Sequence, residues 1–331
     1  MNTKFKTDVP VALVFFNRPE CFEKVFKAVA KARPSILFLI QDGPRKNKDE
    51  DNEKVMACRD CIKIDWECKV YKDYSTENLG CGLRVFSGIS KAFEIVDRLV
   101  IIEDDVVIGE DMLPFCSEML ERYKNDERVG IISGMNHLWE YARCPNSYFF
   151  SARGGAIWGW ATWKRVWDCV EWNLECANDN YVMDSLSNLS LPQINGKELA
   201  MRTKNKYASI TKGERQTSWS TQFIVSSCIL QNRLYLVPSK NLISNIGIVG
   251  EHVNHSGISA IPRGMRKIYF APTYVLERPL RHPKYMIDDS IYYTEQRKIM
   301  TGGSFIRKLY RMLEGKIYKL FPFLGDDSYK K

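Results

Sequence analysis

No apolar run in this 331-residue chain reaches the about 20 residues that a helix needs to cross a bilayer. The first residues, Met1 to Pro10, also lack the apolar core of a signal peptide. These two absences predict a cytoplasmic protein without a membrane-spanning helix. Internal repeats and flexible linkers are missing too, which favours one compact domain with an added C-terminal lobe.

The ten cysteines stand in a chain without an export signal, so the sequence predicts free thiols rather than disulfides. Cys58, Cys61 and Cys68 are close enough along the chain to suggest zinc. A structural zinc site needs four ligands in paired spacing, and no second Cys-x-x-Cys or His-x-x-x-His follows. Half-buried thiols are therefore the favoured interpretation, with zinc as the alternative.

The positive charge of the chain is concentrated at its C-terminal end. The formal net charge is +8, and residues 261–331 alone hold 15 Lys and Arg against 7 Asp and Glu. The remaining 33 basic and 33 acidic residues balance one another within residues 1–260. A nucleic-acid-binding protein would carry its excess over a binding face, so this distribution argues against a nucleic-acid partner.

Short apolar runs alternate with helical patterns from residue 10 to about 135, which predicts an α/β fold with a doubly wound, mostly parallel sheet flanked by helices. The expected strands are Val11–Phe16, Ile36–Ile40, Glu67–Tyr71, Leu99–Ile102 and Val129–Ser133. The expected helices are Glu20–Ala32, Asp49–Arg59, Leu83–Val96 and Met112–Tyr123.

After residue 140 the pattern becomes irregular and rich in Trp, Gly and Tyr, as in an irregular C-terminal lobe. Helices are expected at Thr162–Val170, Glu198–Ile210 and Thr217–Asn232, and a strand at Leu234–Val237. We therefore expect a catalytic domain over residues 1–260 and a basic, partly helical extension over residues 261–331.

Three polar signals follow predicted strands: Arg18, Asp42 and the triplet Glu103-Asp104-Asp105. Ligands of parallel α/β sheets bind beyond the carboxyl ends of the strands, so these signals favour a site at one rim. Adjacent carboxylates repel one another unless a cation compensates, which suits a hard divalent metal bound together with phosphate oxygens. The alternatives are a solvated turn for the triplet, a surface ion pair for Arg18 and a turn-former for Asp42.

The segment from Gly80 to Arg84 combines small residues with a cation at an expected helix start. Backbone amides there can hold a phosphate, with Arg84 as the charge partner. A plain helix cap explains the same residues, because the fuller Gly-x-Gly-x-x-Gly pattern is missing.

Together these motifs resemble the GT-A glycosyltransferases, in particular the group of the N-acetylglucosaminyltransferase that begins N-glycan branching and its bacterial relatives. The resemblance spans residues 10–256, and its most specific parts are the acidic triplet and the run Asn241-Leu242-Ile243-Ser244-Asn245-Ile246-Gly247. The motifs that carry it are Phe15-Phe16-Asn17-Arg18-Pro19, Ile40-Gln41-Asp42-Gly43, Asn78-Leu79-Gly80, Val100-Ile101-Ile102-Glu103-Asp104-Asp105, Ala156-Ile157-Trp158-Gly159-Trp160, Asn241-Leu242-Ile243-Ser244-Asn245-Ile246-Gly247 and His255.

The resemblance implies a GT-A (Rossmann-like) fold and a Mn²⁺ or Mg²⁺ ion held by Asp105, with His255 as a second ligand for which His252 competes. It implies that the donor is a nucleotide-diphosphate sugar, with a UDP-sugar favoured. Glu103 and Asp104 would face the ribose or the donor sugar. The remaining donor-binding residues that it implies are Arg18, Asp42, Gly80, Arg84, Gly159 and Trp160.

One motif departs from the family. Relatives often carry an acid, a candidate catalytic base, just after the Trp of a Trp-x-x-Gln motif, and here the segment is Trp219-Ser220-Thr221-Gln222. An inverting transfer needs a carboxylate to take the acceptor proton. Glu214 is the nearest upstream candidate, with Asp179 and Asp184 behind it, so the stereochemical outcome stays open.

The tail from Ser304 to Phe323 places apolar residues at helix-compatible spacing, with basic residues between them. The apolar residues are Phe305, Leu309, Leu313, Leu320 and Phe321, and the basic ones are Arg307, Lys308, Arg311, Lys316 and Lys319. A helix of this kind suits an anionic membrane surface, which would place the protein on the inner face of the membrane. A helix packed on the domain with its charges in water is the open alternative.

The sequence thus predicts a metal-dependent glycosyltransferase that moves a sugar from a nucleotide diphosphate to a glycan or lipid-linked acceptor. One alternative is a sugar nucleotidyltransferase, which would want a Gly-rich basic loop directly after the first strand, where this chain has Asn17-Arg18-Pro19-Glu20. The other is a non-catalytic glycan- or nucleotide-binding protein, favoured by the missing acid at Ser220.

Overall fold

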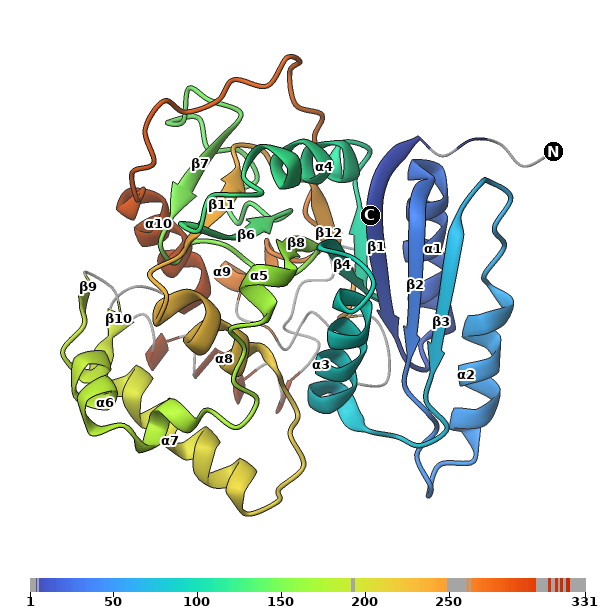
Figure 1. Ribbon diagram of the computed structural model, residues 1–331, viewed down its shortest axis with the longest axis horizontal. Coiled ribbons are helices and arrows are strands. Elements are labelled where there is room, and N and C mark those ends of the chain that lie inside the picture. Colours follow the sequence, from blue (N-terminus) through green and yellow to red (C-terminus); the bar gives the residue numbers. More distant parts are fainter. Residues whose placement is uncertain are drawn as a thin grey trace.

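The computed structural model describes residues 4, 6–191, 194–248, 261 and 263–301, and in the tail 309–310, 313–314, 316–317 and 320–321. Its centre is an eight-stranded sheet with the order β3-β2-β1-β4-β8-β6-β11-β7 (Figure 1). The strands of this sheet are β1 (Thr7–Phe15), β2 (Pro34–Gln41), β3 (Lys69–Tyr74), β4 (Arg98–Glu103), β6 (Val129–Ser133), β7 (Tyr148–Ser151), β8 (Trp160–Trp163) and β11 (Leu234–Pro238).

The first four strands in this order are all parallel, and β11 pairs with β6 in parallel as well. β8 is antiparallel to both β4 and β6, and β7 is antiparallel to β11. The chain therefore has the mixed α/β architecture with a mostly parallel central sheet, flanked by helices, that its apolar runs predict. Two further pairs join β5 (Val106–Ile108) to β12 (Ile243–Asn245) and β9 (Ser190–Leu191) to β10 (Ile194–Asn195).

Helices connect these strands and cover the sheet (Figure 1). In the first half they are α1 (Pro19–Ala32), α2 (Glu50–Asp60), α3 (Gly80–Phe93) and α4 (Met112–Arg122). In the second half they are α5 (Lys164–Trp167), η1 (Glu175–Asn178), α6 (Asn180–Ser187), α7 (Gly196–Thr211), α8 (Ser220–Gln222), the π-helix η2 (Phe223–Ile229), α9 (Arg263–Arg266) and α10 (Ser290–Thr301). None of the helices described is long and apolar enough to cross a membrane.

Helix α1 shows how the local sequence sets an element. Pro19 stands in its first turn, where the missing N–H costs nothing. Phe22, Val25, Phe26 and Val29 recur at helical spacing, and all of them are buried. The helix ends at Arg33, whose backbone is left-handed with φ 45°.

The second half differs from the sequence expectation at two places. The segment expected as a helix over Thr162–Val170 begins as part of strand β8, and only Lys164–Trp167 is helical. Every residue of β8 is buried, and a short, fully buried run has no period that separates strand from helix. The helix expected over Thr217–Asn232 is present as α8 and η2, with a π-helical turn in its second part.

A buried histidine ties α10 to the core and makes folding stability depend on pH. His137 contacts Gln296 at 3.1 Å, and its backbone N–H donates to the Tyr292 hydroxyl at 3.0 Å. Burial, helped by the charge of Lys267, lowers the pKa of His137 to about 4. An unfolded chain binds this proton near pH 6.5, so protonation favours unfolding as the pH falls from 6.5 toward 4.

We therefore expect the free energy of unfolding to fall by about 2 kcal/mol between pH 7 and pH 5 on account of His137, at 1.36 kcal/mol per pKa unit. Urea titrations at the two pH values measure the change. The His137→Gln variant keeps a polar side chain for Gln296 but does not titrate, so its pH dependence should be flatter by that amount. If the free energy of unfolding changes equally between pH 7 and pH 5 in both proteins, His137 is not the group responsible.

Candidate functional site

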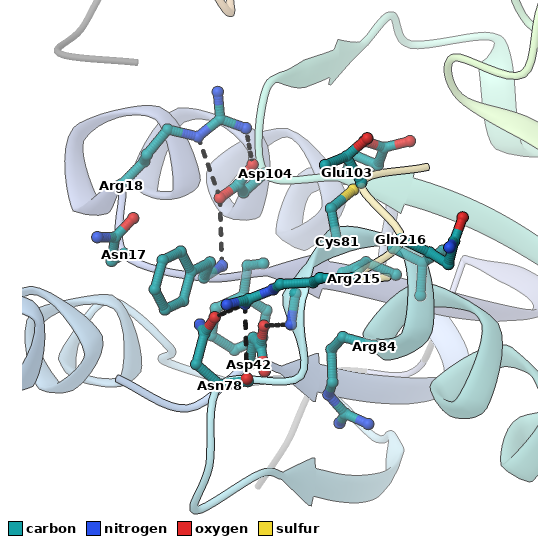
Figure 2. Close-up of a pocket in the computed structure, with 16 residues that line it drawn as sticks. Asn17, Arg18, Asp42, Asn78, Cys81, Arg84, Glu103, Asp104, Arg215 and Gln216 are labelled. Atoms are coloured by element: carbon teal, nitrogen blue, oxygen red, sulfur yellow. Dashed lines mark hydrogen bonds and ion pairs between the residues drawn. The ribbon is translucent and has the colours of Figure 1, made fainter. Parts of the chain in front are cut away.

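The strand register brings the predicted polar residues to one edge of the sheet. In β1, Val14 pairs with Ile40 of β2 and with Glu103 of β4, so the three parallel strands end level. A cavity of about 340 Å³ lies just beyond these ends (Figure 2). Among the residues that line it are Phe16, Asn17, Arg18, Asp42, Asn78, Gly80, Cys81, Arg84, Glu103, Asp104, Arg215 and Gln216.

Arg18 pairs with two carboxylates of the acidic triplet. Its Nε donates to Asp104 Oδ2 at 3.3 Å, its Nη2 donates to Asp104 Oδ1, and its Nη1 donates to Asp105 Oδ2 at 2.9 Å. Burial alone would lower the pKa of Arg18, but Asp104 and Asp105 outweigh burial and raise it above its ordinary value. The pairing therefore lies inside the cavity wall, where Asp104 is only 5% exposed.

Glu103 lines the same cavity, and among the described residues its side chain has no hydrogen-bond or ion-pair partner. Burial, with the charges of Asp105 and Asp104, raises the pKa of Glu103 to about 8, and Arg18 offsets only part of this. One guanidinium thus stands against three acidic side chains. A further cation at this edge would relieve the remaining repulsion.

Asp105 is enclosed from the other side by the Asn241–Gly247 run. Strand β12 pairs with β5, which directly follows Asp105, and the Ile246 N–H donates to the Asp105 carbonyl at 2.8 Å. Asn245 Nδ2 contacts Asp105 Oδ1 at 3.5 Å, and a Cβ at Gly247 would lie 2.0 Å from Asp105 Oδ2. This run is one of the most specific parts of the sequence resemblance, and the fold brings it against the triplet.

The donor set fits a hard divalent cation that is bound together with a diphosphate. Carboxylate oxygens are the ligands that Mg²⁺ prefers, and it is usually held by one or two carboxylates, waters and substrate phosphates. The described part of the chain holds no cluster of three or more His, Cys, Asp or Glu arranged for a metal. His255 and His252 lie outside the described residues. None of the described cysteines, Cys58, Cys61 and Cys68 included, forms a disulfide.

Asp42 fixes the loop that opens helix α3. Its carboxylate accepts hydrogen bonds from the N–H groups of Leu79 and Gly80, both at 2.8 Å, and from its neighbour Gly43 at 3.0 Å. It is 5% exposed and lines the cavity. Asp42 therefore holds the amide end of α3 against the rim.

Arg84 belongs to the cavity wall, but its guanidinium points away from the cavity (Figure 2). It donates to the carbonyls of Gln41 and Asp73 and pairs with Asp73 Oδ2 at 2.8 Å. The side chain is 3% exposed. In this structure the Arg84 guanidinium, which was expected to contact a phosphate, instead links β2 to the edge strand β3.

Arg215 is a cavity cation that the sequence alone did not single out. It lies against Gly80, whose φ is +81°, and a Cβ at that glycine would come within 2.7 Å of Arg215 Nε. Arg215 Nη2 donates to Asn78 Oδ1, and the Gly82 N–H donates to the Gln216 carbonyl at 3.2 Å. The segment after α7 thus reaches across to the start of α3. Arg215 lies 135 positions beyond Gly80 in the chain, so its neighbours in sequence give no sign of this contact.

The other predicted residues that the structure describes, Asp105 among them, do not line the cavity. Glu214 is exposed, and its Oε2 accepts from Ser209 Oγ at 2.6 Å, one residue before Arg215. Trp160 is 0% exposed and stacks on Trp219, with 5.6 Å between the ring centroids. Gly159 packs near Val106 and Ile243, close to the segment that surrounds Asp105. In this conformation Trp160 is core packing rather than a ligand contact.

Comparisons with known proteins give remote likenesses among solved structures. No family model matches the chain, and no curated protein sequence matches it significantly. Among solved structures, the chain is similar to mouse xyloside xylosyltransferase 1, with 11% identity, 70% of this chain and 84% of that one covered, and a TM-score of 0.32. It is also similar to an inositol-1-phosphate CTP transferase from T. maritima, with 10% identity, 73% and 91% covered, and a TM-score of 0.35. Likenesses this remote do not choose between glycosyl and nucleotidyl transfer.

Proposed function

We propose that this chain is a metal-dependent glycosyltransferase that binds a nucleotide-diphosphate sugar in the cavity at the strand ends. The observation that carries the proposal is the charge pattern of that cavity. Arg18 and Arg215 suit a diphosphate, while Glu103 and Asp104 of the cavity wall, with Asp105 bound beside them by Arg18, suit the cation that accompanies it.

Each part of the site has a task that its contacts support. Asp42 fixes the loop that opens α3 by accepting the Leu79 and Gly80 N–H groups, and Arg215 supplies a planar donor group for phosphate oxygens. Asp105, with His255 as the second proposed ligand, would hold Mn²⁺ or Mg²⁺, and the bound ion would stabilise the charge that develops on the departing diphosphate. Glu103 and Asp104 would face the ribose or the donor sugar, as in the resembling family.

For the catalytic base, Glu214 is the proposed residue because it neighbours the cavity-lining Arg215. Of the two other candidates, Asp179 already accepts the N–H groups of Tyr181 and Val182 as the cap of α6. A carboxylate that takes the acceptor proton would give an inverting transfer. The acceptor class we propose is a glycan or a lipid-linked sugar.

The turn after β1 argues against sugar nucleotidyl transfer. Arg18 leads directly into α1 at Pro19, and the turn is closed by the Phe16 N–H donating to Asp104 Oδ2 at 3.3 Å. No Gly-rich basic loop stands there to hold a triphosphate. Slow hydrolysis of the donor separates an enzyme from a protein that only binds donors, because only the enzyme hydrolyses them.

A thermal-shift screen of nucleoside diphosphates, with and without Mn²⁺, tests the proposal. One nucleotide, with UDP expected, should stabilise the protein in the presence of Mn²⁺ by about 2.7 kcal/mol at a hundred times its Kd. UDP-sugars should behave alike and be hydrolysed slowly. A flat response to every nucleotide with Mn²⁺ would contradict the proposal.

The tail supports a second part of the proposal, attachment to the inner face of a membrane. The apolar side chains of the tail that the structure describes are exposed, from 43% at Leu309 and 48% at Leu313 to 73% at Leu320. Between Arg307 and Lys319 the sequence carries five basic residues and one acidic residue. Apolar and basic side chains facing solvent together suit an anionic lipid surface.

We expect truncation after Gly303 to abolish sedimentation with anionic vesicles and to leave hydrolysis of a soluble donor unchanged. Each basic residue near the surface contributes about 1 kcal/mol, and a Debye length of about 8 Å at physiological salt should make the attachment salt-sensitive. Vesicles of neutral lipid are the control. If the truncated protein unfolds, or if the intact protein ignores anionic vesicles at low salt, the membrane proposal fails.

A further inference from the structure

Arg18 holds two of the carboxylates that the proposed function assigns to the donor complex, and it does so without any ligand. We infer that Arg18 is an internal counter-ion of the acidic triplet, which a divalent cation has to displace and which a bound diphosphate draws away. This inference rests on the proposed function, since it concerns the order in which the same site takes up its cation and nucleotide.

The contacts of Asp105 show why a cation meets resistance. Its Oδ2 accepts from Arg18 Nη1 at 2.9 Å, and on the other side Gly247 lies so close that a Cβ there would come within 2.0 Å of the same oxygen. Asp105 Oδ2 is thus enclosed between Arg18 and the Asn245–Gly247 turn. A cation that uses this oxygen has to move the guanidinium, and the two positive charges repel one another at ligand distances.

The position of Arg18 gives the guanidinium another anion to turn to. The side chain is 25% exposed and lines the cavity in which the diphosphate is proposed to bind. Phosphate oxygens offer a guanidinium the same paired geometry as a carboxylate. A nucleotide can therefore take Arg18 from Asp105 and free that carboxylate for the metal.

The consequence is positive coupling between cation and nucleotide. Each ligand removes the interaction that hinders the other, and the coupling must be equal in both directions. The cation alone should bind weakly, because it competes with Arg18. The site would thereby load with metal only when the nucleotide arrives.

The test is the affinity for Mn²⁺ alone, measured from the free Mn²⁺ signal in electron paramagnetic resonance, in the wild type and in Arg18→Gln. We expect Arg18→Gln to bind Mn²⁺ without nucleotide at least tenfold more tightly. In the same variant, UDP should raise the Mn²⁺ affinity by a smaller factor than in the wild type. Equal affinities of the two proteins for Mn²⁺ alone would overturn the inference.

Two more variants make the result specific. Arg215→Gln removes the same charge from the same cavity without touching Asp104 or Asp105, so its affinity for Mn²⁺ alone should stay within about twofold of the wild type. A gain as large as that of Arg18→Gln would show a general field effect and overturn the inference. Arg18→Lys keeps one charge and cannot bridge both carboxylates, so it should give an intermediate gain and carries the test if Arg18→Gln does not fold.

The outcomes separate this inference from the proposed function. If the wild type binds UDP with Mn²⁺ while Arg18→Gln and wild type bind Mn²⁺ alone equally, only the counter-ion role is wrong. If no nucleotide binds to any of the proteins, with Mn²⁺ or without, the proposed function is wrong and this inference falls with it.

Discussion

Asp105→Asn is expected to remove the Mn²⁺-dependent part of nucleoside diphosphate binding, a loss of at least about a hundredfold in affinity, or about 2.7 kcal/mol. A neutral amide keeps the shape of the carboxylate but is a poor ligand for a hard dication. The strand pairing around the residue uses its carbonyl oxygen, which the substitution leaves in place. The fold should therefore survive, and calorimetry with UDP, with and without Mn²⁺, measures the loss.

Asp111→Asn is the matched control. Asp111 is also a nearly buried aspartate paired with an arginine, since it contacts Arg278 at 2.9 Å and accepts the Leu276 N–H at 2.9 Å. Neither aspartate lines the cavity itself, but Asp105 is bound by Arg18, which does, whereas Asp111 is bound by Arg278, which does not. We expect this variant to lose stability and to keep its Mn²⁺-dependent nucleotide binding. If Asp105→Asn retains the Mn²⁺ dependence, the metal assignment is wrong.

The strand ends were readable from the sequence because parallel strands buried on both faces are short continuous apolar runs. In β1, eight of nine residues are buried, and the first polar residues after it, Asn17 and Arg18, reach the rim. The same logic located Asp42 and the acidic triplet. Residues that follow level, parallel strands meet in space, so their approach needs no knowledge of distant contacts.

The pattern failed where an apolar run had no period or where a contact joined distant segments. The last two residues of β8, Thr162 and Trp163, fall within the helix expected over Thr162–Val170, because so short a buried segment shows no period that separates strand from helix. Arg215 was missed because its contact with Gly80 exists only after the segment following α7 folds back onto α3. Arg84 follows Gly80 by four positions, and this closeness in sequence suggested a phosphate contact. The direction of a side chain on a helix is set by its position around the helix axis, and that of Arg84 leads away from the cavity.

Arg84 and Arg215 both line the cavity, and we expect opposite effects when each is replaced: a loss of stability for Arg84 and a loss of nucleotide affinity for Arg215. Arg84 is a buried partner of Asp73 and of two carbonyls, so Arg84→Met leaves those groups without their donor. Breaking such a pair costs about 3 kcal/mol. Arg215 is exposed, so Arg215→Met should change the free energy of unfolding by less than about 0.5 kcal/mol. If Arg215 meets the diphosphate, its loss should weaken nucleotide affinity about tenfold, or about 1.4 kcal/mol.

Urea unfolding measures the stability of both variants, and calorimetry measures their affinity for the nucleotide. We expect Arg84→Met to lose stability while its folded fraction binds UDP and Mn²⁺ within about threefold of the wild type, because its guanidinium points away from the cavity. We expect Arg215→Met to show the reverse. A stable Arg84→Met protein with weakened nucleotide binding would return the phosphate contact to Arg84, and it would mean that the side chain turns toward the cavity when the donor binds.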